Sequence, residues 1–176
     1  LVSKAISNNV SCVKVSEMAI YLKFKANTIG FNEDVILGFC YIPPEGSPFY
    51  CEKELKNGID VLNEEVMNVK SDFSCSILLM GDFNARTAEN IEYIDYGTMS
   101  FIDDDYVNDS VDMPRTSKDK VINKFGRSLI ELCKTYDMYI VNGRYGTDAG
   151  VGDFTYISQH GCSVVDYCIA DRELLE

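Results

Sequence analysis

The order of apolar and polar residues predicts strands of two kinds in the first half of the chain. Residues 12–24 alternate between apolar and polar side chains, which is typical of two antiparallel strands that are each buried on one face. Residues 35–41 and 76–80 are instead continuously apolar. Continuous runs are typical of strands that are covered on both faces, so we expect these two strands within a covered sheet.

Two longer segments carry apolar residues at helical spacing. Residues 50–69 keep one apolar face, and so do residues 118–136, for which Thr116 and Ser117 are the expected N-terminal cap. A strand, a helix and a second apolar strand in succession predict a βαβ-like layering within one α/β domain that covers residues 1–176. Three shorter strands are expected further along the chain, at residues 138–141, 153–157 and 163–169.

Composition and charge narrow the classes of function. The formal net charge of −12 argues against a broad basic surface for nucleic acid, but it leaves open a phosphate site in which a divalent cation supplies the positive charge. Residues 87–117 are acidic and lack periodicity, which predicts a solvated loop rather than a metal site at residues 103–105. No apolar run is long enough to cross a membrane. The seven cysteines include no CxxC pair, so we expect reduced thiols in an intracellular protein of the nucleus or cytoplasm.

Polar residues stand at the ends of the expected strands. Tyr41 ends one apolar strand, Asp82 and Asn84 end the next, and Asp166 lies within the last. A carboxylate is costly to bury unless it is paired, hydrogen-bonded or bound to a metal. One such aspartate alone favours a structural role. Two of them, with an asparagine and a tyrosine at similar places in a layered fold, favour a functional site, because such folds gather their chemistry where strands end side by side.

Five short motifs occur together, and their combination is more specific than any one of them: Tyr41-Ile42-Pro43-Pro44, Gly81-Asp82-Phe83-Asn84-Ala85-Arg86-Thr87, Asn142-Gly143-Arg144, Phe154-Thr155-Tyr156-Ile157-Ser158 and Ser163-Val164-Val165-Asp166-Tyr167. With these motifs the chain resembles the endonuclease/exonuclease/phosphatase superfamily, and most closely the endonuclease domain of LINE-type (non-LTR) retrotransposons. The resemblance covers most of the chain. It implies a four-layer sandwich of two mixed β-sheets flanked by helices, present as a single partial domain that is truncated at both ends.

The resemblance also implies an activity, which is Mg²⁺-dependent hydrolysis of the DNA phosphodiester backbone by one domain of a retrotransposon polyprotein, with Mn²⁺ able to replace Mg²⁺. Asp82 would position or deprotonate the attacking water and contribute weakly to the metal site. Asn84 would hydrogen-bond the scissile phosphate or that water, and Tyr41 would donate toward the phosphate oxygens. Asp166 would orient a catalytic histidine, while the metal would stabilise charge on the phosphate. The expected substrate-binding residues are Thr155, Ser163, Asn142 and Arg86.

Two features of the family are missing from the chain. No early strand carries the family's metal-binding glutamate, and no terminal Ser-Asp-His motif follows Asp166. The one histidine, His160, lies in a turn-like stretch before Ser163. We therefore expect that the 176-residue chain on its own nicks DNA weakly or not at all. Two other functions stay open at this point: hydrolysis of a phosphorylated small molecule or lipid head group, and a catalytically dead remnant that acts as an interaction module.

Overall fold

The computed structural model describes residues 2–55, 57–93 and 114–175, so the acidic residues 103–105 lie outside the described part of the chain. The strands are β1 (Val10–Val15), β2 (Ala19–Phe24), β3 (Val35–Tyr41), β4 (Ser76–Asp82), β5 (Met138–Ile140), β6 (Tyr156–Ser158), β7 (Gly161–Ser163) and β8 (Asp166–Asp171). The helices are α1 (Pro48–Glu52), α2 (Gly58–Asp72) and α3 (Lys124–Tyr136), with short 3-10 helices at Ser7–Asn9, Gly146–Asp148 and Arg172–Leu174.

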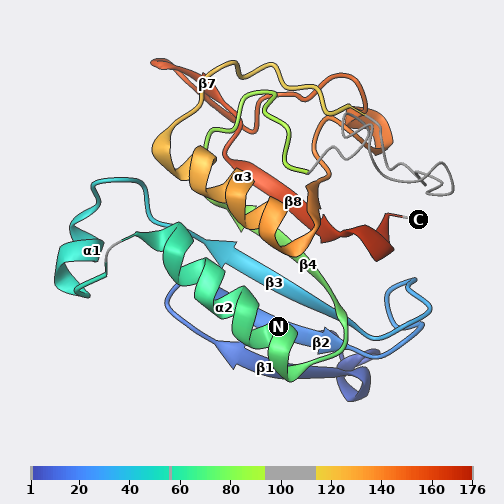
Figure 1. The fold of residues 1–176 in the computed structure, drawn as a ribbon. Helices are drawn as coiled ribbons and strands as arrows, with labels where there is room; N and C mark the ends of the chain where they lie inside the picture. Colours follow the sequence, from blue (N-terminus) through green and yellow to red (C-terminus); the bar gives the residue numbers. More distant parts are fainter. Residues whose placement is uncertain (1, 56, 94–113, 176) are drawn as a thin grey trace, which may run out of the picture.

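Two sheets and a helical layer make up the fold (Figure 1). The larger sheet has six strands in the order β1-β2-β3-β4-β8-β5, and the smaller sheet is formed by β6 and β7. The larger sheet is mixed, because β3 and β4 are parallel whereas its other neighbouring strands are antiparallel. The mixed α/β class that the sequence predicts is therefore confirmed.

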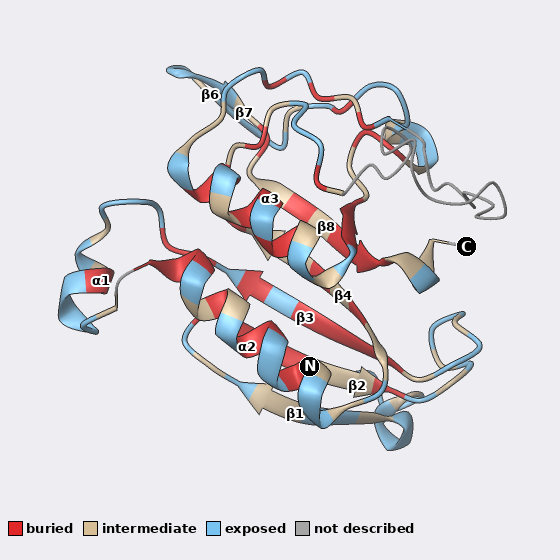
Figure 2. Cartoon of the chain, in the orientation of Figure 1, coloured by how far each residue is buried: buried red, intermediate tan, exposed pale blue. Residues whose placement is uncertain are grey.

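The two apolar strands β3 and β4 are neighbours in the middle of the larger sheet, as their composition predicts. They are in register from Val35 opposite Ser76 to Tyr41 opposite Asp82. α2 lies in the connection between them, and α3 packs beside α2 on the same face of the sheet (Figures 1 and 2). The main core fills the space between these helices and the sheet; among its members are Ile36, Leu62, Val66, Ile77, Leu79, Leu129 and Leu132.

The single helix expected at residues 50–69 is wrong, because the structure has α1 and α2 with a break between them. The side chain of Asn57 accepts a hydrogen bond from the backbone N–H of Ile59 at 2.9 Å and so caps the start of α2. Gly58 follows at a position where a Cβ would lie 2.5 Å from a methyl carbon of Ile42. The local signal for the break was therefore the Asn-Gly pair, which starts a new helix.

The expected start of the second long helix at residue 118 is also wrong. α3 begins at Lys124, and its cap is Asn123 rather than Thr116 or Ser117. The residues before it are taken up by contacts with other parts of the fold: Asp119 forms an ion pair with Arg86. These long-range contacts outweigh the helical spacing of the apolar residues, and Val121, which was expected on the buried face, is exposed.

The strand expected at residues 163–169 is interrupted, since β7 ends at Ser163 and β8 begins at Asp166. The N–H of Val164 donates to Asp119 and the N–H of Val165 donates to Thr155, so neither joins a strand ladder through its N–H. The strand expected at residues 153–157 begins later, at Tyr156. The two antiparallel strands expected at residues 12–24 are confirmed as β1 and β2.

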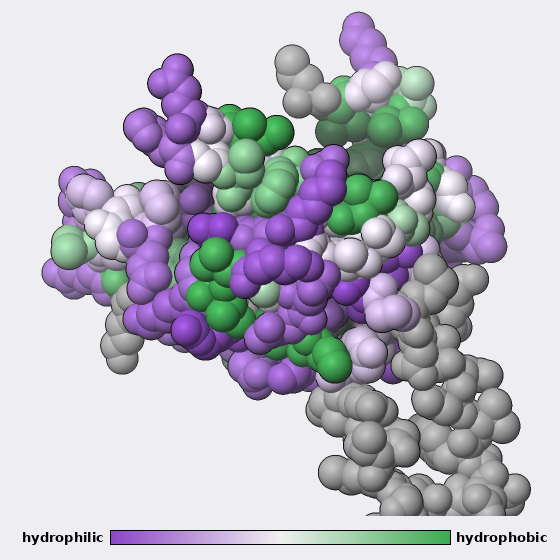
Figure 3. All heavy atoms as spheres, turned by 90° about the horizontal axis from the view of Figure 1, so that it is seen from above, coloured by the Kyte–Doolittle hydropathy of each residue, from purple (hydrophilic) through white to green (hydrophobic). Residues whose placement is uncertain are grey.

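The surface agrees with the acidic composition. Seen from above, hydrophilic side chains prevail and hydrophobic side chains are scattered among them (Figure 3). On the face of the larger sheet that turns away from α2 and α3, Ile20 and Phe39 are register partners and are 45% and 42% exposed. None of the helices in the described ranges combines the length and the apolar composition that crossing a membrane requires.

Candidate active site

Three of the residues predicted to act in catalysis lie side by side across the larger sheet. Tyr41 at the end of β3 is the register partner of Asp82 at the end of β4, and Asp82 is the register partner of Asp166 at the start of β8. Residues that face each other in neighbouring strands project from the same side of a sheet, with Cβ atoms about 5 Å apart. The sheet therefore brings together three polar side chains that are far apart in the sequence.

Gly81 explains how β4 ends at Asp82. Its φ is +141°, and a Cβ at this position would lie 1.9 Å from the carbonyl oxygen of Cys40 in β3, so only glycine fits between the two strands. Beyond Asp82 the side chains alternate, because Phe83 and Ala85 are fully buried in the core while Asn84 between them is half-buried. Within the Gly-Asp-Phe-Asn motif, Phe83 therefore packs in the core, while Asp82 and Asn84 stay partly exposed.

Asn84 is held in a left-handed backbone conformation with φ +47°. Its N–H donates to Oδ1 of Asp82 at 2.9 Å, and its Nδ2 donates to the carbonyl oxygen of Ile42 at 2.9 Å. Ile42 directly follows β3, so Asn84 joins the ends of β3 and β4. The structure therefore brings Asn84 to the same group as Tyr41, Asp82 and Asp166.

The carboxylates of Asp82 and Asp166 repel each other. Burial raises the pKa of Asp82, the negative charge of Asp166 raises it further, and the N–H of Asn84 acts against this shift. Like charges on directly opposed residues destabilise a sheet. A cation or a proton bound at the pair would relieve this repulsion, so the pair has the charge that a cation site requires.

The backbone of Asp166 is fixed by two further residues that were predicted to bind substrate. Oγ1 of Thr155 accepts hydrogen bonds from the N–H groups of Val165 and Asp166 at 3.0 and 3.1 Å. Asn142 donates from Nδ2 to the carbonyl oxygen of Asp166 at 3.2 Å and accepts from the N–H of Cys168 at 2.9 Å. Thr155 and Asn142 therefore set where β8 begins and how Asp166 is oriented.

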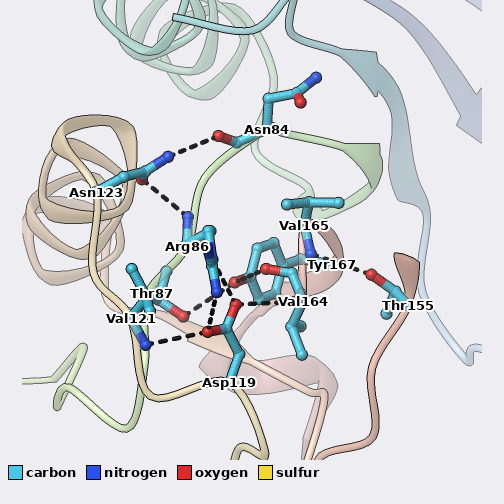
Figure 4. A network of polar contacts seen from close by, with 10 residues as sticks. All are labelled: Asn84, Arg86, Thr87, Asp119, Val121, Asn123, Thr155, Val164, Val165 and Tyr167. Atoms are coloured by element: carbon cyan, nitrogen blue, oxygen red, sulfur yellow. Dashed lines mark hydrogen bonds and ion pairs between the residues drawn. The ribbon is translucent and has the colours of Figure 1, made fainter. Parts of the chain in front are cut away.

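Arg86, also predicted to bind substrate, is engaged by Asp119 through two hydrogen bonds of 2.7 and 2.6 Å (Figure 4). Burial alone would raise the pKa of Asp119, but hydrogen bonds from Arg86, Val121 and Val164 together hold it below its usual value. Arg86 is consequently held in a structural ion pair.

Ser163, the fourth residue predicted to bind substrate, forms a backbone contact: its carbonyl oxygen accepts the N–H of Thr155 at 3.1 Å. Contacts of these residues with a substrate stay a prediction.

The donor set for a metal consists of oxygen atoms. Within residues 2–55, 57–93 and 114–175, no three His, Cys, Asp or Glu side chains are close enough to hold a metal ion between them. Asp82 and Asp166 could together hold a divalent cation, because Mg²⁺ is commonly bound by one or two carboxylates and completes its coordination with water and substrate phosphate. His160 lies in the turn between β6 and β7, as the sequence predicts.

Two residues of this region were missed in the sequence. Asp119 and Asn123 lie in a stretch that was expected to be helical, but they bind the segment that follows Asn84. The signal for Asn123 was its position directly before Lys124 and Phe125, where an asparagine is a typical N-terminal cap. No local signal identifies Asp119, because its partner Arg86 is distant in the sequence.

Comparisons with known proteins support the fold. No protein-family model matches the sequence, and no curated protein matches it either. Among solved structures, the human Nocturnin catalytic domain, solved with a bound sulfate anion, is similar with a TM-score of 0.51 and 10% sequence identity. The match covers 94% of this chain and 50% of the Nocturnin chain, so this chain spans about half of that domain. At 10% identity this likeness shows the fold alone, which is similar to that of the Nocturnin catalytic domain over the part that this chain spans.

Proposed function

We propose that this chain is part of the endonuclease domain of a retrotransposon polyprotein, which cleaves phosphodiester bonds of DNA in the presence of Mg²⁺ or Mn²⁺, and that the chain on its own cleaves them only weakly. The observation that carries the proposal is the row of Tyr41, Asp82 and Asp166, with Asn84 beside it, on a fold similar to that of the Nocturnin catalytic domain. Retrotransposon origin and DNA as substrate rest on the resemblance of the motifs around these residues.

In this proposal Asp82 and Asp166 hold the divalent cation, which when bound supplies a Lewis acid for the charge on the phosphate. Asp82 would also position the attacking water or accept a proton from it. Tyr41 is 57% exposed, so its hydroxyl is accessible to donate a hydrogen bond to a phosphate oxygen. Asn84 orients the phosphate or the water through its carboxamide.

The acidic charge of the chain bears on how DNA would bind. At a formal net charge of −12 the protein as a whole repels the phosphate backbone. A bound divalent cation cancels the charge of the carboxylate pair, because it adds two positive charges where two negative charges face each other. We therefore expect DNA binding itself, and not only cleavage, to depend on the metal.

The test is nicking of supercoiled plasmid by the full chain with Mg²⁺, with Mn²⁺ and with EDTA. This substrate suits slow nicking, since a single nick converts each plasmid molecule to the relaxed form. We expect the wild-type chain to nick weakly and only with metal, and we expect this nicking to fall by about a hundredfold or more in Asp82→Asn and in Asp166→Asn. Asp60→Asn on the exposed side of α2 is the matched control and should keep the wild-type rate.

A binding measurement separates the metal site from the reaction. Calorimetric titration with Mn²⁺ should show binding to the wild type and to Asp60→Asn, and weaker binding to Asp82→Asn. Wild-type protein that neither binds Mn²⁺ nor nicks plasmid would contradict the proposal. Hydrolysis of p-nitrophenyl phosphate without plasmid nicking would instead assign the chain to phosphatases of small molecules.

A further inference from the structure

The side chain of Asn123 contacts three backbone groups, one in α3 and two in the segment that follows β4. Figure 4 shows the two contacts with Asn84 and Arg86. Its Oδ1 accepts the N–H of Gly126 at 2.7 Å, which caps α3, and also the N–H of Arg86 at 2.9 Å. Its Nδ2 donates to the carbonyl oxygen of Asn84 at 3.0 Å. One carboxamide therefore ties the start of α3 to the segment that follows β4.

The segment that follows β4 and the first turn of α3 are closely packed against each other. The backbone N–H of Asn123 donates to the carbonyl oxygen of Arg86 at 3.1 Å. A Cβ on Gly126, in the first turn of α3, would lie 1.8 Å from the same oxygen. The first turn of α3 thus lies directly against residues 84–86, and Asn123 is the polar side chain at the centre of the contact.

Asn84 depends on support from outside its own segment. Its φ of +47° lies in the left-handed region, which asparagine adopts more readily than most residues but less readily than glycine, so contacts that hold this backbone matter. The hydrogen bond from Asn123 fixes the carbonyl of Asn84, and the hydrogen bonds to Asp82 and Ile42 fix its N–H and its carboxamide. Without the bond from Asn123, the carbonyl of Asn84 is no longer held, so the Asn84 backbone is able to relax out of the left-handed region. A change of its φ turns the Cα–Cβ bond and with it the carboxamide.

We propose that Asn123 is a positioning residue: it fixes the backbone of Asn84 and thereby the direction of the Asn84 carboxamide beside Asp82 and Asp166. Asn123 itself does not touch the substrate, since its polar atoms are engaged by Asn84, Arg86 and Gly126. The effect on catalysis rests on the proposed function, whereas the effect on the conformation of Asn84 does not.

The variant Asn123→Asp separates positioning from capping. Aspartate caps a helix as well as asparagine does, so α3 keeps its cap and we expect the melting temperature to stay close to that of the wild type. Aspartate has no N–H to donate and places a negative charge against the carbonyl oxygen of Asn84. The matched control is Asn57→Asp, which makes the same substitution at the cap of α2.

Hydrogen exchange measured by NMR on the full chain reads the conformation directly. We expect exchange of the Asn84 amide to accelerate about tenfold or more in Asn123→Asp relative to the amide of Leu79 within β4, and to stay unchanged in Asn57→Asp. Unchanged exchange at Asn84 in Asn123→Asp would overturn the proposal. This measurement needs neither metal nor DNA, so it decides on positioning even if the proposed function fails.

Plasmid nicking then reads the consequence for the reaction. We expect Asn123→Asp to lower kcat about tenfold with KM nearly unchanged, because DNA still binds but the reacting groups are misaligned. The double variant Asn84→Ala with Asn123→Asp should be no slower than Asn84→Ala alone. A wild-type kcat in Asn123→Asp, with accelerated exchange at Asn84, would overturn the catalytic half of the proposal.

Discussion

Asp82 and Asp166 face each other in register on the antiparallel strands β4 and β8, so that two carboxylates project from the same side of the sheet. Tyr41 continues the row on the other side of Asp82. Opposed like charges destabilise a sheet, and the pKa of Asp82 is raised by its burial and by this neighbour. The repulsion between the two carboxylates thus lowers the stability of the fold, and a cation bound between them would relieve it.

Replacing Asp82 should therefore stabilise the protein when no metal is bound. In EDTA at neutral pH we expect Asp82→Asn to raise the free energy of unfolding by about 0.5 to 1 kcal/mol, the size of a cross-strand pair. The folded-state pKa of Asp82 lies above its unfolded value, so its contribution to stability is present below the unfolded pKa and is lost as pH rises through the folded pKa. Denaturant unfolding across this range of pH measures both effects.

Two comparisons check this explanation. Mg²⁺ should raise the melting temperature of the wild type and have little effect on that of Asp82→Asn, since binding to the folded state alone stabilises it. Asp60→Asn, on the exposed side of α2, should behave like the wild type. A lower stability of Asp82→Asn in EDTA would show that the carboxylate contributes more through its bond to the Asn84 N–H than it loses through repulsion.

The hydroxyl of Thr155 should contribute more to the stability of the fold than is usual for an exposed side chain. Thr155→Val removes the acceptor for the N–H groups of Val165 and Asp166 and should lower the free energy of unfolding by about 1 kcal/mol. The exchange of the Asp166 amide should accelerate at the same time. Thr155→Ser keeps the hydroxyl and is the matched control, so equal stability of the two variants would show that the hydroxyl does not contribute.

Gly126→Ala should destabilise the protein although alanine favours helices. The new Cβ would lie 1.8 Å from the carbonyl oxygen of Arg86, so α3 has to move away from the segment that follows β4. We expect a loss of about 2 to 3 kcal/mol by denaturant unfolding. Ser128→Ala on the same helix has no such contact in the structure and should be neutral or slightly stabilising. A stabilised Gly126→Ala variant would mean that α3 does not dock as the structure has it.

The ion pair of Asp119 with Arg86 should govern stability in acid. The folded-state pKa of Asp119 lies below its usual value, so its contribution is present above the unfolded pKa of about 4 and is lost as pH falls through the folded pKa. Asp119→Asn should lower the free energy of unfolding at neutral pH by about 2 kcal/mol, since it weakens charge-assisted hydrogen bonds to a buried group. It should also flatten the decline below pH 4, which stability curves at several pH values would reveal.

The parts of the fold that the sequence predicted are those that depend on neighbouring residues. The apolar runs of β3 and β4 identify central strands because their burial on both faces leaves no polar positions. Asp82 and Asn84 stood out because they follow such a run directly. Tyr41 also stood out at the end of its strand, and Asp166 as a carboxylate within the last expected strand. The register of the sheet brings both beside Asp82.

The parts that were wrong depend on contacts between distant residues. Residues 118–123 have the spacing of a helix, but Asp119 is bound by Arg86 and Asn123 by Asn84, and these bonds keep the segment out of the helix. The interruption of the last strand has the same cause, since Val164 and Val165 donate to Asp119 and Thr155. The spacing of apolar residues does not predict such hydrogen bonds, because their partners are distant in the sequence and come close only in the folded chain.

The position of β8 also sets the order in which the site is able to form during synthesis. β8 follows β5 along the chain, yet it lies between β4 and β5 in the sheet. Until residue 166 has left the ribosome, β4 has an unpaired edge beside Asp82 and the second carboxylate does not exist. A nascent chain therefore has no carboxylate pair, so cleavage activity of the proposed kind would begin only after the late strand β8 has paired with β4.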